Sequence, residues 1–189
     1  MRNEIISIFK ESAEIKVRFA EENFPRIEQV VKVIIQALRR GNKILLFGNG
    51  GSAADAQHIA AELVNRYLFD RNPLPAIALT TDTSILTSIS NDLGFEEVFA
   101  RQLVALGKKD DIAWGITTSG NSLNIIRAFR VAKELGLITV GFTGKGGGAV
   151  ASLVDYNFNV VSDSTPRIQE AQLTLAHVIC ELVERRLKQ

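Results

Sequence analysis

The two histidines of the sequence are the side chains best suited to transfer protons or to bind a metal. His58 lies four residues before Glu62, and Gln169 lies eight residues before His177, each pair in a stretch with helical spacing of apolar residues. Both spacings place the two side chains on one helix face. Two imidazoles, a carboxylate and an amide oxygen suit a divalent transition metal such as zinc, and an imidazole beside a carboxylate can also relay protons. A His–Glu pair at this spacing is more often an ordinary surface pair, and periodicity does not show whether the two helices meet.

A glycine-rich segment, Gly48-Asn49-Gly50-Gly51-Ser52-Ala53, follows an apolar run and opens a helical stretch. Glycines let a backbone approach a ligand closely, and the N–H groups of a helix start suit an anionic or hydroxyl-rich ligand. A tight strand-to-helix turn is the plainer interpretation. The segment also matches the G-x-G-x-x-A form of the dinucleotide fingerprint, but the acidic residue that this motif requires, Asp82, comes late after the next strand. The dinucleotide interpretation is therefore the weaker one.

A hydroxyl-rich segment, Thr117-Thr118-Ser119-Gly120-Asn121-Ser122, also lies between an apolar run and a helical stretch. Its hydroxyls and the following helix start can surround a phosphate without a basic residue, and the segment contains no Lys or Arg. Ser122 could act only as a helix N-cap, but a cap needs one hydroxyl and this segment supplies more. The G-x-x-x-x-G-K-[ST] pattern of a Walker loop is absent. The segment therefore predicts phosphate binding.

Apolar runs that alternate with helical stretches must position these segments. Buried strands between helices predict an α/β fold, a three-layer sandwich whose five-stranded parallel sheet is covered on both faces. In such folds ligands bind beyond the carboxyl ends of the strands, where both segments lie. Strands are predicted at 43–47, 76–79, 112–117, 138–142 and 156–161. Helices are predicted at 52–67, 83–91, 95–106, 122–135, near 148–153 and at 166–187.

The first forty residues are predicted to form an N-terminal helical hairpin. Pro25 suits the first turn of a second helix, which would end near Arg40 before Gly41. No low-complexity linker divides the chain, so residues 1–189 are predicted to form a single domain that includes these helices. In the first helix, apolar residues recur between charges at Ile5, Ile8, Phe9, Ile15 and Phe19.

Composition argues against several classes of protein. The 189 residues carry 22 basic and 21 acidic side chains, a net charge of +1, which predicts no broad attraction to nucleic acid or to a membrane surface. The sequence shows neither a signal peptide nor an apolar stretch of the roughly 20 residues that span a bilayer, so we expect a cytoplasmic protein. Cys180 is the single cysteine and lies in an apolar helical run, where we expect a buried, unreactive thiol.

Motifs from separate regions of the chain agree in order and spacing with one known family. They are Asn49-Gly50-Gly51-Ser52, His58 with Glu62, Asn91-Asp92, Thr118-Ser119-Gly120-Asn121-Ser122, and Arg167-Ile168-Gln169-Glu170 with His177. In these motifs the chain resembles the phosphoheptose isomerases, single-domain members of the sugar isomerase (SIS) family with a flavodoxin-like sheet. The resemblance covers nearly the whole chain.

The resemblance implies an aldose-ketose isomerase that converts sedoheptulose 7-phosphate into D-glycero-D-manno-heptose 7-phosphate, the first step toward nucleotide-activated heptose for surface polysaccharide. It also implies a homotetramer with active sites between subunits. By the same resemblance, Glu62 and His177 form the acid/base pair, and one zinc ion per subunit is bound by His58, Glu62, Gln169 and His177. The implied substrate contacts are Asn49, Gly50, Gly51, Glu62, Asn91, Asp92, Thr117, Thr118, Ser119, Ser122 and Gln169.

Two residues depart from the family pattern, and other functions are possible. Thr117 stands where many members have Ser and keeps the hydroxyl, whereas Pro166 stands where several isomerases have Asp. One alternative is a non-catalytic SIS-domain regulator that binds the replication initiator protein. Such relatives resemble this chain in the glycine-rich and Arg-Ile-Gln-Glu segments but lack equivalents of Glu62 and His177. A sugar-phosphate sensor and a nucleotide-dependent oxidoreductase are further alternatives.

Overall fold

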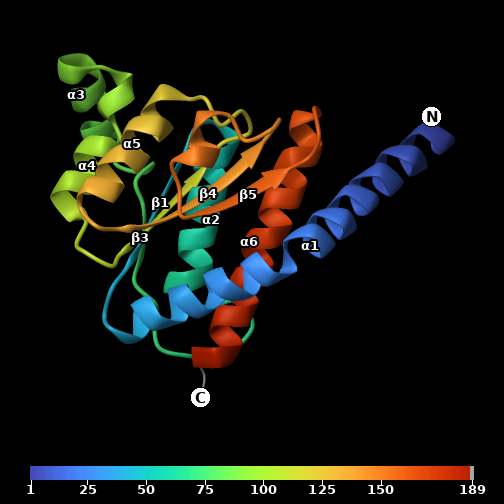
Figure 1. Cartoon of the computed structure of the whole chain (residues 1–189), viewed down its shortest axis with the longest axis horizontal. Helices are drawn as coiled ribbons and strands as arrows, with labels where there is room; N and C mark the ends of the chain where they lie inside the picture. Colours follow the sequence, from blue (N-terminus) through green and yellow to red (C-terminus); the bar gives the residue numbers. More distant parts are fainter. Residues whose placement is uncertain (188–189) are drawn as a thin grey trace.

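Five parallel strands form the centre of the computed structural model, which describes residues 1–187 (Figure 1). The sheet order is β2-β1-β3-β4-β5. This order confirms the predicted α/β sandwich of the flavodoxin type, in which the strand order reverses between β1 and β3. The strands are β1 (Ile44–Gly48), β2 (Ala76–Ala78), β3 (Ile112–Ile116), β4 (Ile138–Gly144) and β5 (Tyr156–Val160).

Helices cover both faces of the sheet and bury alternate strand residues. One face carries α1 (Arg2–Arg39), α2 (Gly51–Val64) and α6 (Thr165–Leu187), which pack with Ile44 and Leu46 of β1. The other face carries α4 (Ala100–Leu106) and α5 (Leu123–Glu134), which pack with Leu45 and Phe47. On this second face also lie α3 (Thr83–Leu93) and the short 3-10 helices η1 (Phe95–Glu97) and η2 (Ala149–Ser152). Burial on both faces explains why the central strands β1 and β3 are continuous hydrophobic runs.

The predicted N-terminal hairpin is wrong, because α1 is one continuous helix of 38 residues. Pro25 lies inside it on the exposed side, where the carbonyl that loses its N–H partner can bind water. The buried face continues past the proline, because Phe19 and Ile27 are eight residues, slightly more than two helical turns, apart, and it packs along α6 in the core. A proline inside a helix costs about 3 kcal/mol, and burial on both sides of Pro25 offsets this. The buried face comprises Ser12, Ile15, Phe19, Ile27, Val30, Val31, Ile34, Ile35 and Ala37.

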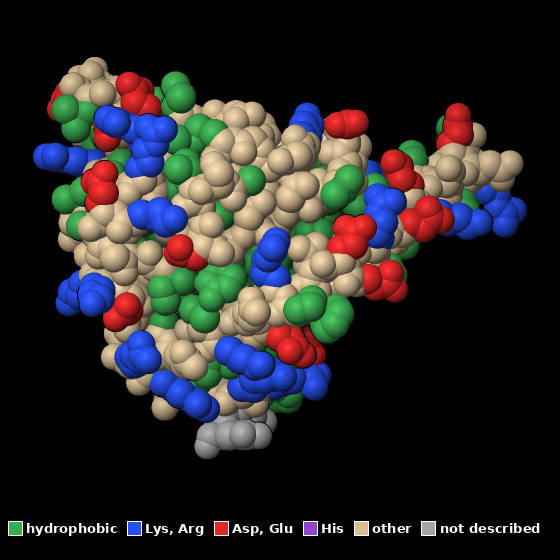
Figure 2. All heavy atoms as spheres, in the orientation of Figure 1, with side chains coloured by type: hydrophobic (Ala, Val, Ile, Leu, Met, Phe, Trp, Pro, Cys, Tyr) green, Lys and Arg blue, Asp and Glu red, His purple; other side chains and the backbone are tan. Residues whose placement is uncertain are grey.

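The first part of α1 projects from the body of the protein, as Figure 2 shows. Residues 2–11, which we call the N-terminal arm, are all exposed. Ile5, Ile8 and Phe9 therefore do not join the core, and Phe9 is 71% exposed. The buried stripe begins only near Ile15. At 1.5 Å per residue, α1 is about 57 Å long, longer than the sheet that it crosses.

The single thiol lies in the core, as the sequence predicts. Cys180 on α6 is 1% exposed and packs within the hydrophobic cluster of the α1–α2–α6 face. Burial raises the pKa of this thiol to about 12, so that the reactive thiolate is scarce at neutral pH. Across residues 1–187, no helix combines the length and apolar character needed to cross a membrane.

A buried ion pair ties together the amino-terminal ends of β1 and β3. Lys43 and Asp111 directly precede these strands, and the Asp111 carboxylate is 1% exposed. It accepts hydrogen bonds from the Lys43 ammonium, from the Lys43 N–H at 3.0 Å and from the Lys108 N–H at 2.9 Å. Burial acts to raise the pKa of Asp111, but these hydrogen bonds, that of the Lys43 side chain foremost, bring it below its ordinary value.

Asp111→Asn should lower the free energy of unfolding by about 1–3 kcal/mol at pH 7, because a buried hydrogen-bonded charge is removed. A carboxyl whose pKa is lowered by folding stabilises the protein above its unfolded pKa and loses this effect as pH falls through the folded pKa. The difference between wild type and Asp111→Asn should therefore be constant above about pH 5 and shrink below about pH 4. Urea unfolding at a series of pH values measures it, and a difference that grows in acid would contradict the assignment.

Candidate active site

The glycine-rich and hydroxyl-rich segments meet where the strand order reverses. One follows β1 and the other follows β3, so both leave the carboxyl ends of neighbouring strands. A small polar pocket of about 90 Å³ lies between them. The pocket is lined by Asn49, Ser52, Ile116, Thr117, Thr118, Ser119, Ser122 and Gln169. The structure thus brings together predicted contacts from the glycine loop, the hydroxyl loop and α6.

Close packing fixes the glycine loop at the start of α2. Gly50 has a φ of +55°, which favours glycine, and a side chain on Gly48 would meet the Ser52 carbonyl oxygen at 2.6 Å. The Asn49 amide exchanges two hydrogen bonds, of 2.9 and 2.8 Å, with the amide of Asn124 on α5. Asn124 is 3% exposed and was missed by sequence reasoning. The sequence feature that could have indicated Asn124 is its position, an amide side chain in the first turn of α5 directly after the hydroxyl loop.

The acidic residue of the dinucleotide fingerprint has a structural role. Asp82 accepts a hydrogen bond from the Ile85 N–H at 2.9 Å and caps α3. A dinucleotide site would use this carboxylate to hold the ribose hydroxyls. The observed capping bond therefore weighs against a nucleotide at the glycine loop.

The hydroxyl loop is folded by its own side chains. Thr117 Oγ1 accepts the Gly120 N–H, and Ser119 Oγ accepts the Asn121 N–H, both at 3.2 Å. Each hydroxyl keeps its hydrogen for another acceptor, such as a phosphate oxygen. Ser122 occupies the N-cap position of α5, but within the described chain its side chain makes no capping hydrogen bond. Its hydroxyl instead lines the pocket, which favours ligand binding over the N-cap interpretation.

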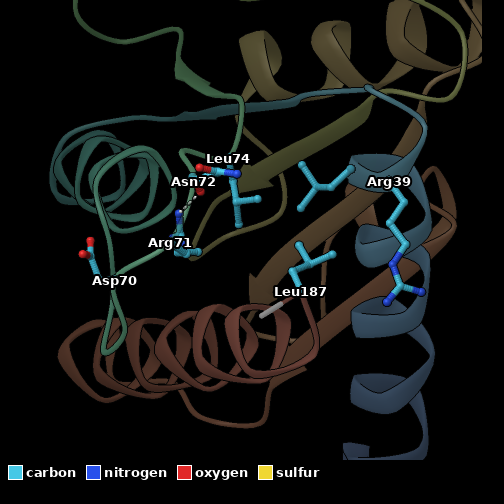
Figure 3. A pocket seen from close by; sticks show the side chains of 7 residues that line it. Arg39, Asp70, Arg71, Asn72, Leu74 and Leu187 are labelled. Atoms are coloured by element: carbon cyan, nitrogen blue, oxygen red, sulfur yellow. Dashed lines mark hydrogen bonds between the residues drawn. The ribbon is translucent and has the colours of Figure 1, made fainter. Parts of the chain in front are cut away.

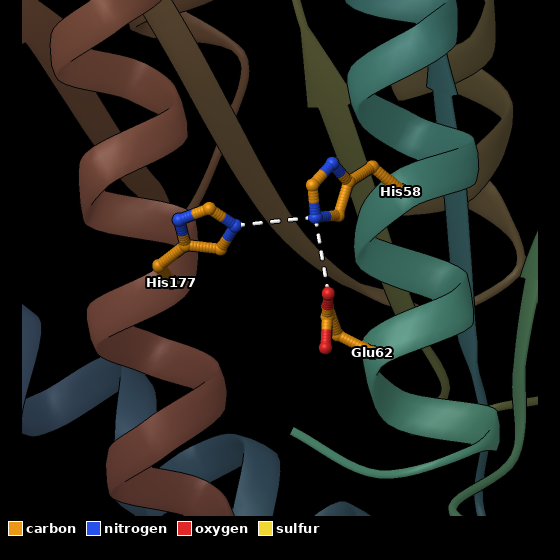
Figure 4. A group of neighbouring side chains, drawn as sticks. All are labelled: His58, Glu62 and His177. Carbon is orange, nitrogen blue, oxygen red and sulfur yellow. Dashed lines mark hydrogen bonds and ion pairs between the residues drawn. The ribbon is translucent and has the colours of Figure 1, made fainter. Parts of the chain in front are cut away.

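His58, Glu62 and His177 come together from two helices, as Figure 4 shows. Nε2 of His58 lies 3.0 Å from Oε1 of Glu62 and 3.3 Å from Nε2 of His177. The side chain of His58 is 45% exposed, so the group is open to solvent in a single chain. The two pairs that were separate in the sequence therefore form one cluster of possible proton donors and acceptors.

The donor set of this cluster fits a divalent metal ion. Two imidazole Nε2 atoms that face each other need a proton or a cation between them. Zinc binds imidazole nitrogen at about 2.0–2.1 Å, and tetrahedral ligands at that distance lie about 3.3–3.4 Å apart. The two Nε2 atoms of His58 and His177 are separated by 3.3 Å. With the Glu62 carboxylate they could hold zinc, and Gln169 stays a prediction as the fourth ligand.

The candidate site follows the contact between α2 and α6, which we call the α2–α6 seam. At its start, Gln169 lies so close to Gly51 that a methyl group on Gly51 would be 2.8 Å from Nε2 of the amide. Two turns further along both helices, His58 faces His177. Seven residues separate Gly51 from His58, which is about 10 Å along a helix. The polar pocket and the histidine cluster therefore lie about 10 Å apart on the same seam.

Two predicted substrate contacts lie away from the seam. Asn91 and Asp92 are on α3, which lies near α4 and α5 in Figure 1, on the other face of the sheet. The Asn91 amide donates a hydrogen bond to Asp92 at 2.8 Å, and both side chains are exposed. None of the described residues of α3 is buried. A single chain therefore does not bring these two residues to the pocket.

Asp55 is a neighbour of the cluster that sequence reasoning missed. It lies three residues before His58 on α2 and is half-buried. Burial raises the pKa of Asp55, and the nearby His58 and His177 act in the opposite direction. The signal in the sequence was the spacing from His58, which places the two side chains on one helix face.

A larger cavity, of about 590 Å³, lies away from these groups (Figure 3). It is bounded by the carboxyl ends of α1 and α6 and by the segment after α2. None of the predicted site residues lies among its described lining, which is Leu38, Arg39, Asp70, Arg71, Asn72, Leu74 and Leu187. Cavity size alone would therefore select the wrong part of the molecule.

Comparisons with known proteins agree with this geometry. Residues 8–144 match the family model of the SIS domain. The chain is 58% identical over 184 residues to the phosphoheptose isomerase of Aquifex aeolicus, covering 97% of this chain and 96% of that protein. Phosphoheptose isomerase structures from Francisella tularensis and Neisseria gonorrhoeae have TM-scores of 0.92 and 0.91, at 38% and 40% identity. These two matches cover 97% of this chain, and 97% and 98% of theirs.

Removing either histidine should weaken metal binding at the cluster. Mutation of a residue that only hydrogen-bonds to a metal ligand lowers metal affinity about 10–100-fold. His58→Ala and His177→Ala each remove a ligand itself, so they should lower the affinity for Co²⁺ or Zn²⁺ by more than this. Calorimetric titration, with Co²⁺ absorption as a second probe, measures the affinity. Glu97→Gln, which removes an ion pair with Arg127 on the other sheet face, is the control. Wild-type affinity in both histidine variants would show that the metal does not bind here.

Proposed function

Because the chain belongs to the phosphoheptose isomerases of the SIS-domain family, we propose that it converts sedoheptulose 7-phosphate into D-glycero-D-manno-heptose 7-phosphate. The observation that carries the proposal is the meeting of His58, Glu62 and His177 on the seam that leads from the polar pocket. In this proposal the product feeds the cytoplasmic synthesis of nucleotide-activated heptose for surface polysaccharide.

The two parts of the seam would divide the work of binding and reaction. The phosphate binds at the hydroxyl loop, where Thr117, Ser119 and Ser122 donate hydrogen bonds beside the start of α5. The carbon chain then extends along the seam, so that its reacting end reaches the cluster about 10 Å away. Binding energy at the remote phosphate orients the reacting carbons against the acid and base.

The reaction moves a proton between C1 and C2 of the sugar through a cis-enediol. In the proposed mechanism, Glu62 and His177 share this work: one removes the carbon-bound proton, and the other serves the neighbouring oxygen. Their side chains come from different helices, and both approach the same atom, Nε2 of His58. A zinc ion held at this cluster would supply positive charge that stabilises the negative charge developing on the sugar oxygen.

Glu62→Gln and His177→Ala should each lower kcat by at least about 10²-fold, the lower end for acid/base groups. Conversion of sedoheptulose 7-phosphate to aldose, followed by NMR with and without a chelator, measures the rate. Glu97→Gln removes a carboxylate from the other face of the sheet and should retain wild-type turnover. Near-normal kcat in either site variant would remove that residue from the mechanism.

A homotetramer with active sites between subunits belongs to the same proposal. The proposed assembly is supported by surfaces that are exposed in a single chain. The N-terminal arm is exposed, and further along α1 the Phe24 side chain is 62% exposed. On α3, Asn91 and Asp92 are polar residues far from their own pocket. A second chain that covers these surfaces could bring its Asn91 and Asp92 to the open side of the cluster.

Mixing of inactive variants tests whether the site is shared. Asp92→Ala and Glu62→Gln should each be inactive alone, and they should regain activity when they are mixed, unfolded and refolded together, because some sites then receive both intact residues. Glu62→Gln mixed with His177→Ala is the matched control. These residues come from one chain, within 4.8 Å, and should give no recovery. Absence of recovery in the first mixture, or full activity of Asp92→Ala, would contradict the shared site.

A further inference from the structure

We infer that the buried ion pair between Arg71 and Glu184, which we call the Arg71–Glu184 clamp, positions Glu62 and His177 for proton transfer. Both side chains are nearly inaccessible, at 6% and 1% exposure, and Arg71 Nε lies 3.1 Å from Glu184 Oε1. The inference rests on the proposed function, because it concerns the residues assigned there to acid/base chemistry.

Glu184, on α6, binds the backbone of the segment that follows α2. Its carboxylate accepts the N–H groups of Tyr67, Leu68 and Phe69 at 2.9, 2.7 and 3.1 Å. Burial acts to raise the pKa of Glu184, but these N–H groups and Arg71 bring it below its ordinary value, so that it is charged at neutral pH. The same bonds explain why α2 ends at Val64, three residues before its predicted end at Tyr67. The Asn65 N–H still bonds to the Ala61 carbonyl, whereas the N–H groups of residues 67–69 bind the carboxylate on α6 instead of continuing the helix.

Arg71 completes the carboxyl end of α2. Nη2 donates a hydrogen bond to the carbonyl of Glu62 at 2.9 Å, and Nη1 donates one to the carbonyl of Leu63 at 2.8 Å. These carbonyls belong to the last turn of α2, where carbonyls lack partners within the helix. Glu62 therefore has its carboxylate against His58 and its backbone held by Arg71. Through Arg71, the backbone position of an acid/base residue depends on α6.

His177 lies on the same side of α6 as Glu184, because seven residues are close to two helical turns. The Tyr67 ring lies 5.7 Å from the His177 ring, and the Tyr67 N–H is one of the groups that Glu184 binds. The clamp thus holds Glu62 through Arg71, and Tyr67 beside His177. It fixes both halves of the acid/base pair relative to each other.

Stability alone is a weak reason for this pair. Replacing a buried ion pair by apolar groups of similar size is often neutral or stabilising, because removing two charges from water is costly. A planar guanidinium with several fixed donors supplies directions as well as attraction. A displacement of about 1 Å at a catalytic group can reduce the rate about 10²-fold, so directional control at this place affects the reaction.

The test compares two buried carboxylates with similar partners. Glu184→Gln and Arg71→Met weaken the clamp. Arg71→Lys keeps the positive charge but loses the several fixed N–H donors of the guanidinium. Asp111→Asn is the matched control, since Asp111 also binds a cation and backbone N–H groups, but at the amino-terminal edge of the sheet. All are assayed well below their unfolding temperatures. We expect Glu184→Gln and Arg71→Met to lower kcat about tenfold or more with little change in KM, and Asp111→Asn to retain kcat.

The histidines provide a second measurement that needs neither substrate nor metal. Because the chain has two histidines, the imidazole NMR signals come only from His58 and His177, whose ring centroids lie 5.1 Å apart. With a chelator present, we expect an NOE between the rings in wild type and Asp111→Asn, and its loss or weakening in Arg71→Met and Arg71→Lys.

Three results would overturn the inference or the function separately. Clamp variants that lose stability but keep kcat and the ring NOE would show a structural role only. Equal losses of kcat in the clamp variants and in Asp111→Asn would show a general effect of stability. This result would also overturn the inference that the clamp positions Glu62 and His177. If wild type does not isomerise sedoheptulose 7-phosphate, the proposed function fails, and the ring NOE still decides whether the clamp positions His177 relative to His58, the neighbour of Glu62. If Glu184→Gln does not fold, the two Arg71 variants decide.

Discussion

The parallel packing of α2 against α6 is the constraint on which the candidate site depends. Each helix follows a strand, so each begins at the carboxyl edge of the sheet and runs back in the same direction. Residues at similar distances from the two helix starts therefore face each other. This is why Gly51 lies by Gln169 and His58 by His177, although more than a hundred residues separate the members of each pair. A change in the relative height of the helices would disturb every contact of the seam.

Much of this arrangement was predictable from sequence, for identifiable reasons. The central strands β1 and β3 are buried on both faces, so they appear as apolar runs, and alternation with helices indicates a parallel sheet. The glycine and hydroxyl loops fall at the ends of β1 and β3, where the fold class predicts a ligand. The long α1 was not predicted, because Pro25 looked like a helix start. The spacing from Phe19 to Ile27 already continued one helix face through it.

The partners of each helix were harder to predict, because periodicity defines a face but not its neighbour. His58 and His177 met as the family resemblance implied, whereas their local spacing left them as separate surface pairs. Asn124 was missed because it acts through hydrogen bonds to Asn49 that only the folded chain shows. Conversely, Asn91 and Asp92 fitted the family motif, and the fold of one chain leaves them exposed on α3.

In the proposed homotetramer, the N-terminal arm would connect folding with assembly. An isolated helix as short as residues 2–11 is marginal in water. The residues of the arm are exposed, and the arm is joined to the body by the hydrogen bond from Arg167 to the Ile8 carbonyl. Its helical order would thus depend on what covers it. Susceptibility of residues 2–11 to a protease would then report how much of the protein is assembled at a given concentration, independently of any assay of turnover.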